Sequence, residues 1–290
     1  MKILIMGGTR YFGRRLVHKL LEKNHEVTVL SRGNVPDDFG SRVQRLKAHR
    51  GDEAAMSAVL AGHTFDVVVD QVCMTAHDAE LSVKLFAGKI SYYLMTSTMS
   101  VYDFAANLPE SAFDARSYRP RKATNPAEQY AEGKRAAEHV FTTQTAFPVA
   151  CARFPVVVGE DDYTERLLGQ VRAVKNGEAI YYPNLDAEFS FITSEDAARA
   201  LFWLLENRKT GPYNFASADA FSLRDLIHKI EVVTGTSARL LSQEGGGVGS
   251  PFGIPSSWYM NVDKASREGF TASLHQQWLV PLLQTYFSKL

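Results

Sequence analysis

The sequence has little of what several classes of protein require. It contains two cysteines among 290 residues, Cys73 and Cys151, and both lie in apolar, strand-like runs. We therefore expect two buried thiols rather than a disulfide. The eight histidines are scattered and show no metal-ligand spacing, so no metal is expected. The N-terminal run MKILIMGG is too short for a secretory leader, and a cytoplasmic location is expected.

Long apolar runs and an excess of one charge are also absent. No apolar stretch reaches the roughly 18 residues of a membrane-spanning helix, so no membrane partner is expected. Lysine plus arginine and aspartate plus glutamate both number 32, which makes a nucleic-acid partner unlikely on electrostatic grounds. Neither a G-x-S-x-G elbow nor a Walker phosphate loop occurs. These absences leave a small-molecule substrate as the expected partner.

The first half of the chain alternates short apolar runs with helical patterns. Continuous apolar strands are buried on both faces, which requires a parallel sheet covered by helices. The predicted fold is therefore an α/β, Rossmann-type, doubly wound parallel sheet. The predicted strands are 2–6, 26–30, 65–70, 92–96, 149–153 and 212–215, and the helices are 14–23, 54–61, 78–87 and 127–143.

The regular alternation stops near Gly159. We expect a dinucleotide-binding domain over 1–158, to which 189–216 returns. In that returning segment a strand precedes a helix capped by Thr193 or Ser194. Residues 159–188 and 217–290 are expected to form a smaller C-terminal α/β domain that binds the substrate, with a helix opened by Ser222.

The strongest local motif is a glycine-rich turn between the first strand and the first helix. Dinucleotide sites use glycine there for a tight turn and for close approach to the pyrophosphate. Arg10 stands where the middle glycine is usual, so an ordinary strand-to-helix turn stays the alternative. The expected cofactor-binding residues are Gly7, Gly8, Thr9, Arg10, Tyr11, Phe12 and Gly13.

The end of the second strand bears on the choice of cofactor. NAD sites usually place an acid there for the ribose hydroxyls, but this chain has Ser31 and Arg32. Arg32, with Arg10, suits a 2′-phosphate, so NADP is the preferred cofactor and NAD the alternative. The alternative is that Arg32 is an ordinary solvated arginine in a loop. Asp52 and Glu53 lie between the predicted strands 26–30 and 65–70, as adenine-contacting acids or simply as the start of a helix.

A tyrosine and a lysine lie one helical turn apart. Tyr130 and Lys134, in YAEGK, therefore share a helix face. A phenol becomes a useful acid or base when a cation stabilises its anion. The fifth strand ends with the hydroxyl side chains of Thr96 and Thr98, at the sheet edge where ligands bind. The alternatives are that Tyr130 and Lys134 are a surface pair on the helix and that the hydroxyls are ordinary turn residues.

Together these residues resemble the extended short-chain dehydrogenase/reductase superfamily, in its NAD-dependent epimerase/dehydratase (sugar-nucleotide-modifying) branch. The resemblance covers nearly the whole chain. It includes GGTRYFG, LMTSTMSVY, YAEGK, RFPVVVG, FITSEDAARAL, GPYNFAS and VDKASREGF.

The resemblance implies roles for particular residues. Tyr130 would be the catalytic acid/base, Lys134 would bind the nicotinamide ribose, and Thr98 would be the catalytic hydroxyl. Phe154 and Pro155 would lie against the nicotinamide. It also implies a homodimer formed by the helices at Asp78–Ala87 and Ala127–Thr143. The remaining expected cofactor-binding residues are Gln71, Val72 and Thr96.

The chain also departs from the family pattern. Met99 and Ser100 replace the Asp-Glu pair of dehydratases, which excludes their acid. Residues 188–190 and 255–259 replace two arginines that many relatives use for a nucleotide diphosphate. The expected activity is an NAD(P)-dependent epimerase or reductase acting on a sugar-nucleotide-like or other carbonyl or secondary alcohol substrate. A non-catalytic regulatory or RNA-associated dinucleotide-binding protein is the alternative.

Overall fold

The computed structural model describes residues 1–241, 243, 245 and 248–290. The chain divides into two compact units. Unit 1 contains Met1–Val101, Glu110–Phe154 and Ala197–Asn214, and unit 2 contains Tyr102–Pro109, Pro155–Asp196 and Phe215–Leu290. The segment that returns to unit 1 is thus shorter than 189–216, because 191–193 pairs with a strand of unit 2.

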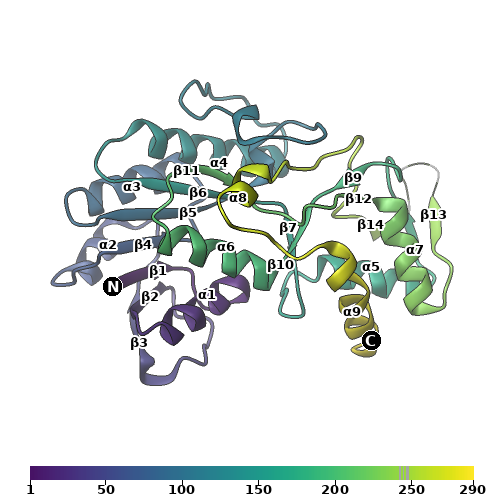
Figure 1. Cartoon of the computed structure of the whole chain (residues 1–290), viewed down its shortest axis with the longest axis horizontal. Helices are drawn as coiled ribbons and strands as arrows, with labels where there is room; N and C mark the ends of the chain where they lie inside the picture. Colours follow the sequence, from purple (N-terminus) through teal and green to yellow (C-terminus); the bar gives the residue numbers. More distant parts are fainter. Residues whose placement is uncertain (242, 244, 246–247) are drawn as a thin grey trace. The chain divides into compact units, whose positions relative to one another are not determined.

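Unit 1 is built on a seven-stranded sheet in the order β11-β6-β5-β4-β1-β2-β3 (Figure 1). Every neighbouring pair is parallel. This is the predicted Rossmann-type topology, with the order reversing beside β1. The strands are β1 (Lys2–Met6), β2 (Glu26–Ser31), β3 (Val43–Lys47), β4 (Val67–Asp70), β5 (Tyr92–Thr98), β6 (Val149–Phe154) and β11 (Gly211–Asn214).

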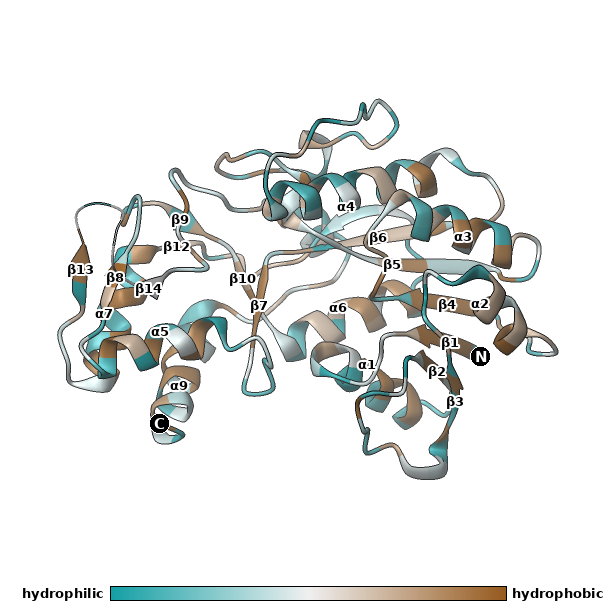
Figure 2. Cartoon of the chain, turned by 180° about the vertical axis from the view of Figure 1, so that it is seen from behind, coloured by the Kyte–Doolittle hydropathy of each residue, from teal (hydrophilic) through white to brown (hydrophobic). Residues whose placement is uncertain are grey.

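Helices cover both faces of this sheet. One face carries α2 (Glu53–Leu60), α3 (Ala76–Phe86) and α4 (Pro126–Thr143), and the other carries α1 (Tyr11–Glu22) and α6 (Ser194–Glu206) (Figures 1 and 2). Two adjacent tyrosines on β5 show how successive side chains point to opposite faces of the sheet. The Tyr92 hydroxyl donates to the Leu204 carbonyl on α6, whereas Tyr93 packs 4.7 Å, centroid to centroid, from Phe141 on α4.

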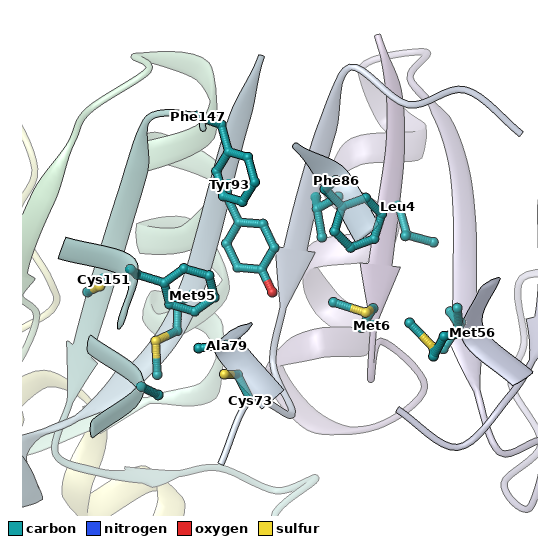
Figure 3. Packing of buried hydrophobic residues seen from close by; sticks show 14 of the residues in the cluster. Leu4, Met6, Met56, Cys73, Ala79, Phe86, Tyr93, Met95, Phe147 and Cys151 are labelled. Atoms are coloured by element: carbon teal, nitrogen blue, oxygen red, sulfur yellow. The ribbon is translucent and has the colours of Figure 1, made fainter. Parts of the chain in front are cut away.

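The core beneath α2, α3 and α4 combines apolar strand and helix side chains. Leu4, Met6, Tyr93 and Cys151 come from the strands, and Figure 3 shows them with Phe86, Met56 and Phe147. Burial of one such side chain stabilises the fold by roughly 1.5–3 kcal/mol. β1 and β4 are correspondingly hydrophobic along most of their length (Figure 2). Both cysteines are free and buried, which confirms the expected thiols.

Among its described residues, unit 2 contains short strands and four helices. β7 (Val156–Val158) pairs in parallel with β10 (Phe191–Thr193), and β9 (Glu188–Phe189) pairs antiparallel with β12 (Phe221–Ser222). β8 (Ala179–Tyr181) lies between β13 (Arg239–Leu241) and β14 (Val248–Gly249). The helices are α5 (Arg166–Lys175), α7 (Leu223–Thr234), α8 (Asp263–Arg267) and α9 (His275–Ser288).

Three short 3-10 helices complete the described elements, at Gly40–Arg42, Met99–Val101 and Glu110–Ala112. Of the two residues considered as the cap of α6, Thr193 is the one whose hydroxyl accepts from the Asp196 backbone N–H, at 3.0 Å. Ser222 caps α7, as expected. Within the described ranges, no helix has both the length and the apolar content needed to span a bilayer.

Gly133 fixes how closely α4 approaches the loop after β4. A Cβ atom at this position would lie 2.3 Å from the backbone oxygen of Met74. Gly133→Ala is therefore expected to destabilise the protein by roughly 1–3 kcal/mol, because the helix must shift. Gly169→Ala on α5, where a Cβ would meet nothing within 4 Å, is expected to stabilise by up to about 1 kcal/mol. Urea denaturation of both variants tests this, and equal stabilities would contradict it.

Candidate active site

The glycine loop packs tightly against the segment that follows β4. Gly7 has φ +88°, and a Cβ on it would lie 2.6 Å from Cγ1 of Val72. A Cβ on Gly13 would lie 2.4 Å from the Oε1 of Gln71. The two glycines thus let β1, α1 and the residues after β4 meet at the carboxyl edge of the sheet, which is the ligand edge of this architecture.

The N-terminus of α1 has features that suit an anion. Arg10 is its N-cap residue but makes no capping side-chain bond, and the first turn contains no acid. By contrast, side chains cap α2, α3 and α4, through Asp52, Thr75 and Asn125 respectively. Uncapped N–H groups and the partial positive charge of a helix N-terminus suit a phosphate group.

The residues after Arg10 adopt an uncommon backbone. Tyr11 has φ +55°, a left-handed conformation that costs a non-glycine residue of order 1 kcal/mol or more. The strained turn directs the next ring, Phe12, to within 5.8 Å of the Phe154 ring at the end of β6, measured between centroids. Pro155, also expected at the nicotinamide, is the first residue of the next unit 2 segment.

A cavity of about 260 Å³ lies beside the end of β2. Thr9, Ser31 and Lys47 are among its lining residues, and Ser31 and Lys47 are register partners on β2 and β3. Arg45 also lines the cavity, but its guanidinium is paired with Asp37. Lys47 was not expected from the sequence, since only the register of β3 makes it the partner of Ser31 on the neighbouring strand.

The other expected adenosine contacts have different surroundings. Arg32 is exposed and is not among the residues that line the 260 Å³ cavity. Asp52 caps α2, accepting from the Ala55 backbone N–H at 2.9 Å, and Glu53 pairs with Lys84. The two carboxylates therefore have structural partners, in agreement with the helix-cap alternative.

Two buried polar atoms at the carboxyl edge have no hydrogen-bond partner among the described residues. They are Nε2 of Gln71 and Oγ1 of Thr96. Buried polar groups are rarely left unpaired, so each such atom indicates a missing ligand or water. Both residues were expected to bind the cofactor, and their free polar atoms fit a dinucleotide lying along this edge.

Lys134 is enclosed below Tyr130 on α4. Its side chain is 2% exposed, and its Nζ donates to the carbonyl oxygens of Cys73 at 2.8 Å and Thr96 at 2.9 Å. The Nζ lies 5.9 Å from the centroid of the Tyr130 ring, while Tyr130 itself is 43% exposed. The pair thus combines a fixed, buried cation with a phenol that a substrate can reach.

Thr98 lies at the end of β5 and is nearly buried. Its hydroxyl accepts from the Ser100 backbone N–H at 3.1 Å and lies 3.3 Å from the Ser100 hydroxyl. This local turn fixes the direction of the Thr98 side chain. The structure thus places the expected hydroxyl on the same sheet edge as Thr96 and the Lys134 ammonium group.

A buried ion pair links the elements that carry the expected catalytic residues. Arg153 on β6 donates to the Glu138 carboxylate on α4 through Nε at 3.0 Å and Nη2 at 2.5 Å, and neither side chain is more than 1% exposed. Glu138 also accepts from the Ser97 hydroxyl, 2.5 Å away. Ser97 precedes Thr98 and Arg153 precedes Phe154, so the pair holds α4, β5 and β6 in fixed relation.

A second cavity, of about 580 Å³, lies behind this ion pair. Phe141 of α4, Cys151 of β6 and Pro212 of β11 are among its lining residues. None of the residues expected to bind the cofactor or to act in catalysis lines it. Burial raises the pKa of the Cys151 thiol, which makes it a poor nucleophile. The candidate cofactor site is therefore the smaller cavity and the carboxyl edge of the sheet, where the expected residues lie.

Comparisons with known proteins agree with this geometry. The model of the NAD dependent epimerase/dehydratase family matches residues 3–85 and 82–216. A solved structure of UDP-glucose 4-epimerase from Thermus thermophilus, in complex with NAD, is similar at a TM-score of 0.76 with 16% identity, covering 99% of each chain. At that identity the likeness concerns the fold.

Two characterised proteins are similar in sequence. One is 2'-dehydrokanamycin reductase of Streptomyces kanamyceticus, 23% identical over 89% of this chain and 70% of its own length. The other is the chloroplast stem-loop binding protein of 41 kDa b of Arabidopsis thaliana, 33% identical over 132 residues. That match spans 40% of this chain and about a third, 35%, of the Arabidopsis protein.

Proposed function

The chain belongs to the NAD dependent epimerase/dehydratase family, and from this premise we propose that it is an enzyme that oxidises or reduces a small-molecule substrate with a bound nicotinamide dinucleotide. Lys134 carries the proposal. No carboxylate within the described residues pairs with its buried ammonium group. A buried charge without a counter-ion is costly even when carbonyl oxygens accept hydrogen bonds from it, and such groups are concentrated where a ligand or a reaction uses them.

The residues at the carboxyl edge of the sheet fit the cofactor in order. The N-terminus of α1 would hold the pyrophosphate, and Ser31 the adenosine ribose, beside the 260 Å³ cavity. Gln71 Nε2 and Thr96 Oγ1, which have no hydrogen-bond partner among the described residues, would form hydrogen bonds with the cofactor. When bound, the nicotinamide supplies or accepts a hydride.

Tyr130 and Lys134 would move the proton. During reduction of a carbonyl group, Tyr130 would donate its hydroxyl proton to the carbonyl oxygen as hydride reaches the carbon, giving a secondary alcohol. Lys134, with two of its three N–H groups fixed on carbonyls, would stabilise the phenolate. The Thr98 hydroxyl would orient the substrate oxygen. In the oxidation of a secondary alcohol, Tyr130 would instead accept the hydroxyl proton as hydride leaves the carbon.

Both reduction and epimerisation are consistent with this chemistry. The name of the Streptomyces relative favours a reductase, whereas the Thermus relative is an epimerase. A screen of carbonyl compounds and sugar nucleotides separates them. A reductase consumes the reduced cofactor, which lowers its absorbance, whereas an epimerase inverts its substrate without a net change in cofactor.

We expect the enzyme to prefer NADP(H) to NAD(H). Because position 31 is a serine, no carboxylate at this position would repel a 2′-phosphate. Two cations are near in the sequence or the fold, since Arg32 follows Ser31 and Lys47 lines the adjoining cavity. Charge-assisted hydrogen bonds contribute roughly 1.5–3 kcal/mol each, which corresponds to a preference of one to two orders of magnitude. Arg10, at the start of α1, would assist either cofactor through the pyrophosphate.

Titration of both cofactors into the wild type, Arg32→Ala and Lys47→Ala tests the preference. Each variant should lose NADP(H) affinity about tenfold while keeping its NAD(H) affinity. Arg42→Ala is the control, because Arg42 neither lines the cavity nor adjoins Ser31 in the sequence, and its Nε donates to the Phe39 carbonyl. Tighter binding of NAD(H) by the wild type would contradict the assignment.

We also expect a homodimer formed through α3 and α4. Ala127 and Ala136 on α4 are not buried within the chain and would permit close helix packing, whereas Ala137 is already in the core of unit 1. Light scattering at micromolar concentration should give twice the chain mass of 32.3 kDa. A mass of one chain at that concentration would refute the dimer.

The likeness to the stem-loop binding protein supports a second candidate, a non-catalytic dinucleotide-binding protein. In such a protein Tyr130→Phe would leave the biological activity intact, and a stem-loop oligonucleotide would bind with a steep salt dependence. The buried Lys134 ammonium group, which donates to two carbonyl oxygens but pairs with no carboxylate among the described residues, favours the enzyme, because a scaffold has no use for the cost of burying a charge without a counter-ion.

A further inference from the structure

Residues 71–75, which follow β4 in unit 1, connect the glycine loop to α4, and we call them the junction loop. Its first two residues lie so close to the glycine loop that a Cβ on Gly7 or Gly13 would clash with them. Further along, the Cys73 carbonyl accepts from the Lys134 ammonium group at 2.8 Å. The junction loop therefore touches both the expected pyrophosphate site and the buried cation.

Two carboxylates accept three of the backbone N–H groups of the junction loop. Oδ1 of Asp70 accepts from the Val72 N–H at 2.9 Å. Oδ2 of Asp78, in the first turn of α3, accepts from the N–H groups of Met74 at 2.9 Å and Thr75 at 3.1 Å. The shape of the loop thus depends on where these two carboxylates are held.

One buried arginine contacts both carboxylates. Arg50, between β3 and α2, is 8% exposed, and its Nη2 donates to Oδ2 of Asp70 at 2.5 Å. Its Nη1 lies 3.7 Å from Oδ1 of Asp78. The same Nη2 donates to the Ser82 hydroxyl on α3 at 2.8 Å. The guanidinium group therefore links the end of β4 to α3, the two elements that flank the junction loop.

Tyr93 on β5 completes this buried network. Its hydroxyl donates to Oδ2 of Asp70 at 2.6 Å and lies 2.8 Å from the Ser82 hydroxyl. Burial raises the pKa of the Tyr93 phenol well above its usual value, so the hydroxyl stays protonated and remains a donor. The positive charge beside the fully buried Asp70 carboxylate comes from Arg50.

Arg50 does not use all of its donors. Its Nε and Nη1 are buried and have no hydrogen-bond partner among the described residues. An arginine that served stability alone would be expected to use more of its N–H groups, because unpaired buried donors destabilise a fold. Its contact with the two carboxylates that hold the junction loop gives the guanidinium group a second use.

We propose that Arg50 is a positioning residue for the cofactor edge of the sheet. By fixing two carboxylates, it keeps the junction loop where the Cys73 carbonyl accepts from Lys134. Arg50 acts through the loop and not by contact with the reacting atoms. The inference rests on the proposed function, since it assigns a role toward the same bound cofactor.

Calorimetric titration of NADPH and of NADH tests the role without requiring a substrate. Arg50→Met should weaken binding of the cofactor about tenfold, because the junction loop is no longer fixed. Arg172→Met is the matched control, since it breaks an exposed pair with Glu165 in unit 2 and should bind like the wild type. Wild-type affinity in Arg50→Met would overturn the proposal.

A double variant separates positioning from stability. Arg50→Met alone leaves the buried Asp70 carboxylate without its cation, whereas Arg50→Met/Asp70→Asn removes both charges and should recover much of the stability in urea denaturation. The contact with Asp78 is still missing, so cofactor affinity should stay about tenfold below that of the wild type. Recovery of affinity together with stability would show a merely structural role and overturn the proposal.

Hydrogen exchange measured by mass spectrometry reports on the loop itself. Peptides that cover 71–75 should exchange about tenfold faster in the double variant than in the wild type, while peptides from β6 should not change. Equal exchange of the junction loop in both proteins would overturn the proposal. Failure of the proposed function would instead appear as a wild type that binds neither NADPH nor NADH, and the exchange of the loop would still decide the role of Arg50.

Discussion

Tyr130→Phe is expected to lower the turnover number about 10²–10⁴-fold while leaving cofactor affinity nearly unchanged, as loss of a general acid/base does. The substitution removes one hydroxyl from a side chain that is 43% exposed, so the fold should not change. Lys134→Met should reduce both turnover and cofactor affinity, because the buried ammonium group lies beside the phenol and at the cofactor edge. Steady-state kinetics and cofactor titration of each variant separate the two effects.

Tyr181→Phe provides the matched control, since it removes the same hydroxyl from β8, outside the proposed site. It should retain wild-type turnover. Full activity of Tyr130→Phe would remove this tyrosine from the mechanism and would favour the non-catalytic alternative.

Glu138→Leu is expected to destabilise the protein by about 3–5 kcal/mol, the usual effect of leaving one member of a buried ion pair without its partner. The Arg153 guanidinium is 0% exposed and would lose its carboxylate, and the Ser97 hydroxyl would lose its acceptor. Urea denaturation measures the free energy of unfolding. Because the chain has two units, the unfolding transition of unit 1, which contains Glu138 and Arg153, is the one to measure.

Two further variants make this test specific. Glu53→Leu breaks the exposed pair with Lys84 and should change stability by no more than about 1 kcal/mol. The double variant Glu138→Leu/Arg153→Met removes both charges and should recover much of the loss. Equal effects of Glu138→Leu and Glu53→Leu would show that burial of the pair contributes nothing.

Most strands of the sheet could be predicted because they are continuous apolar runs, but β3, which is largely exposed, was not predicted. The predicted run 2–6 is β1 itself, and the runs at 26–30, 92–96 and 149–153 are each extended by one or two residues. Local patterns also placed Lys134 and Tyr130 one turn apart on a helix. The parallel register then brought Lys134 to Thr96, as the rule for carboxyl ends of strands implies.

Features that depend on register or on distant segments could not be predicted. β3 is largely exposed, and nothing in its own sequence shows that Lys47 is the register partner of Ser31. The Phe104 and Trp258 rings, whose centroids lie 4.8 Å apart, are more than 100 positions apart in the sequence, so no local pattern shows their contact. The left-handed backbone of Tyr11 has no sequence signal either, because the residue type argues against it.

The buried pair of Arg153 and Glu138 also restricts how this sequence can change over evolutionary time. Loss of either charge alone would pass through a poorly folded intermediate, whereas their joint replacement by apolar residues is tolerable. Relatives should therefore carry both residues or neither, and a lineage that has lost one should carry a compensating change nearby. Such linked substitution would be visible in an alignment as covariation between one position on α4 and one on β6.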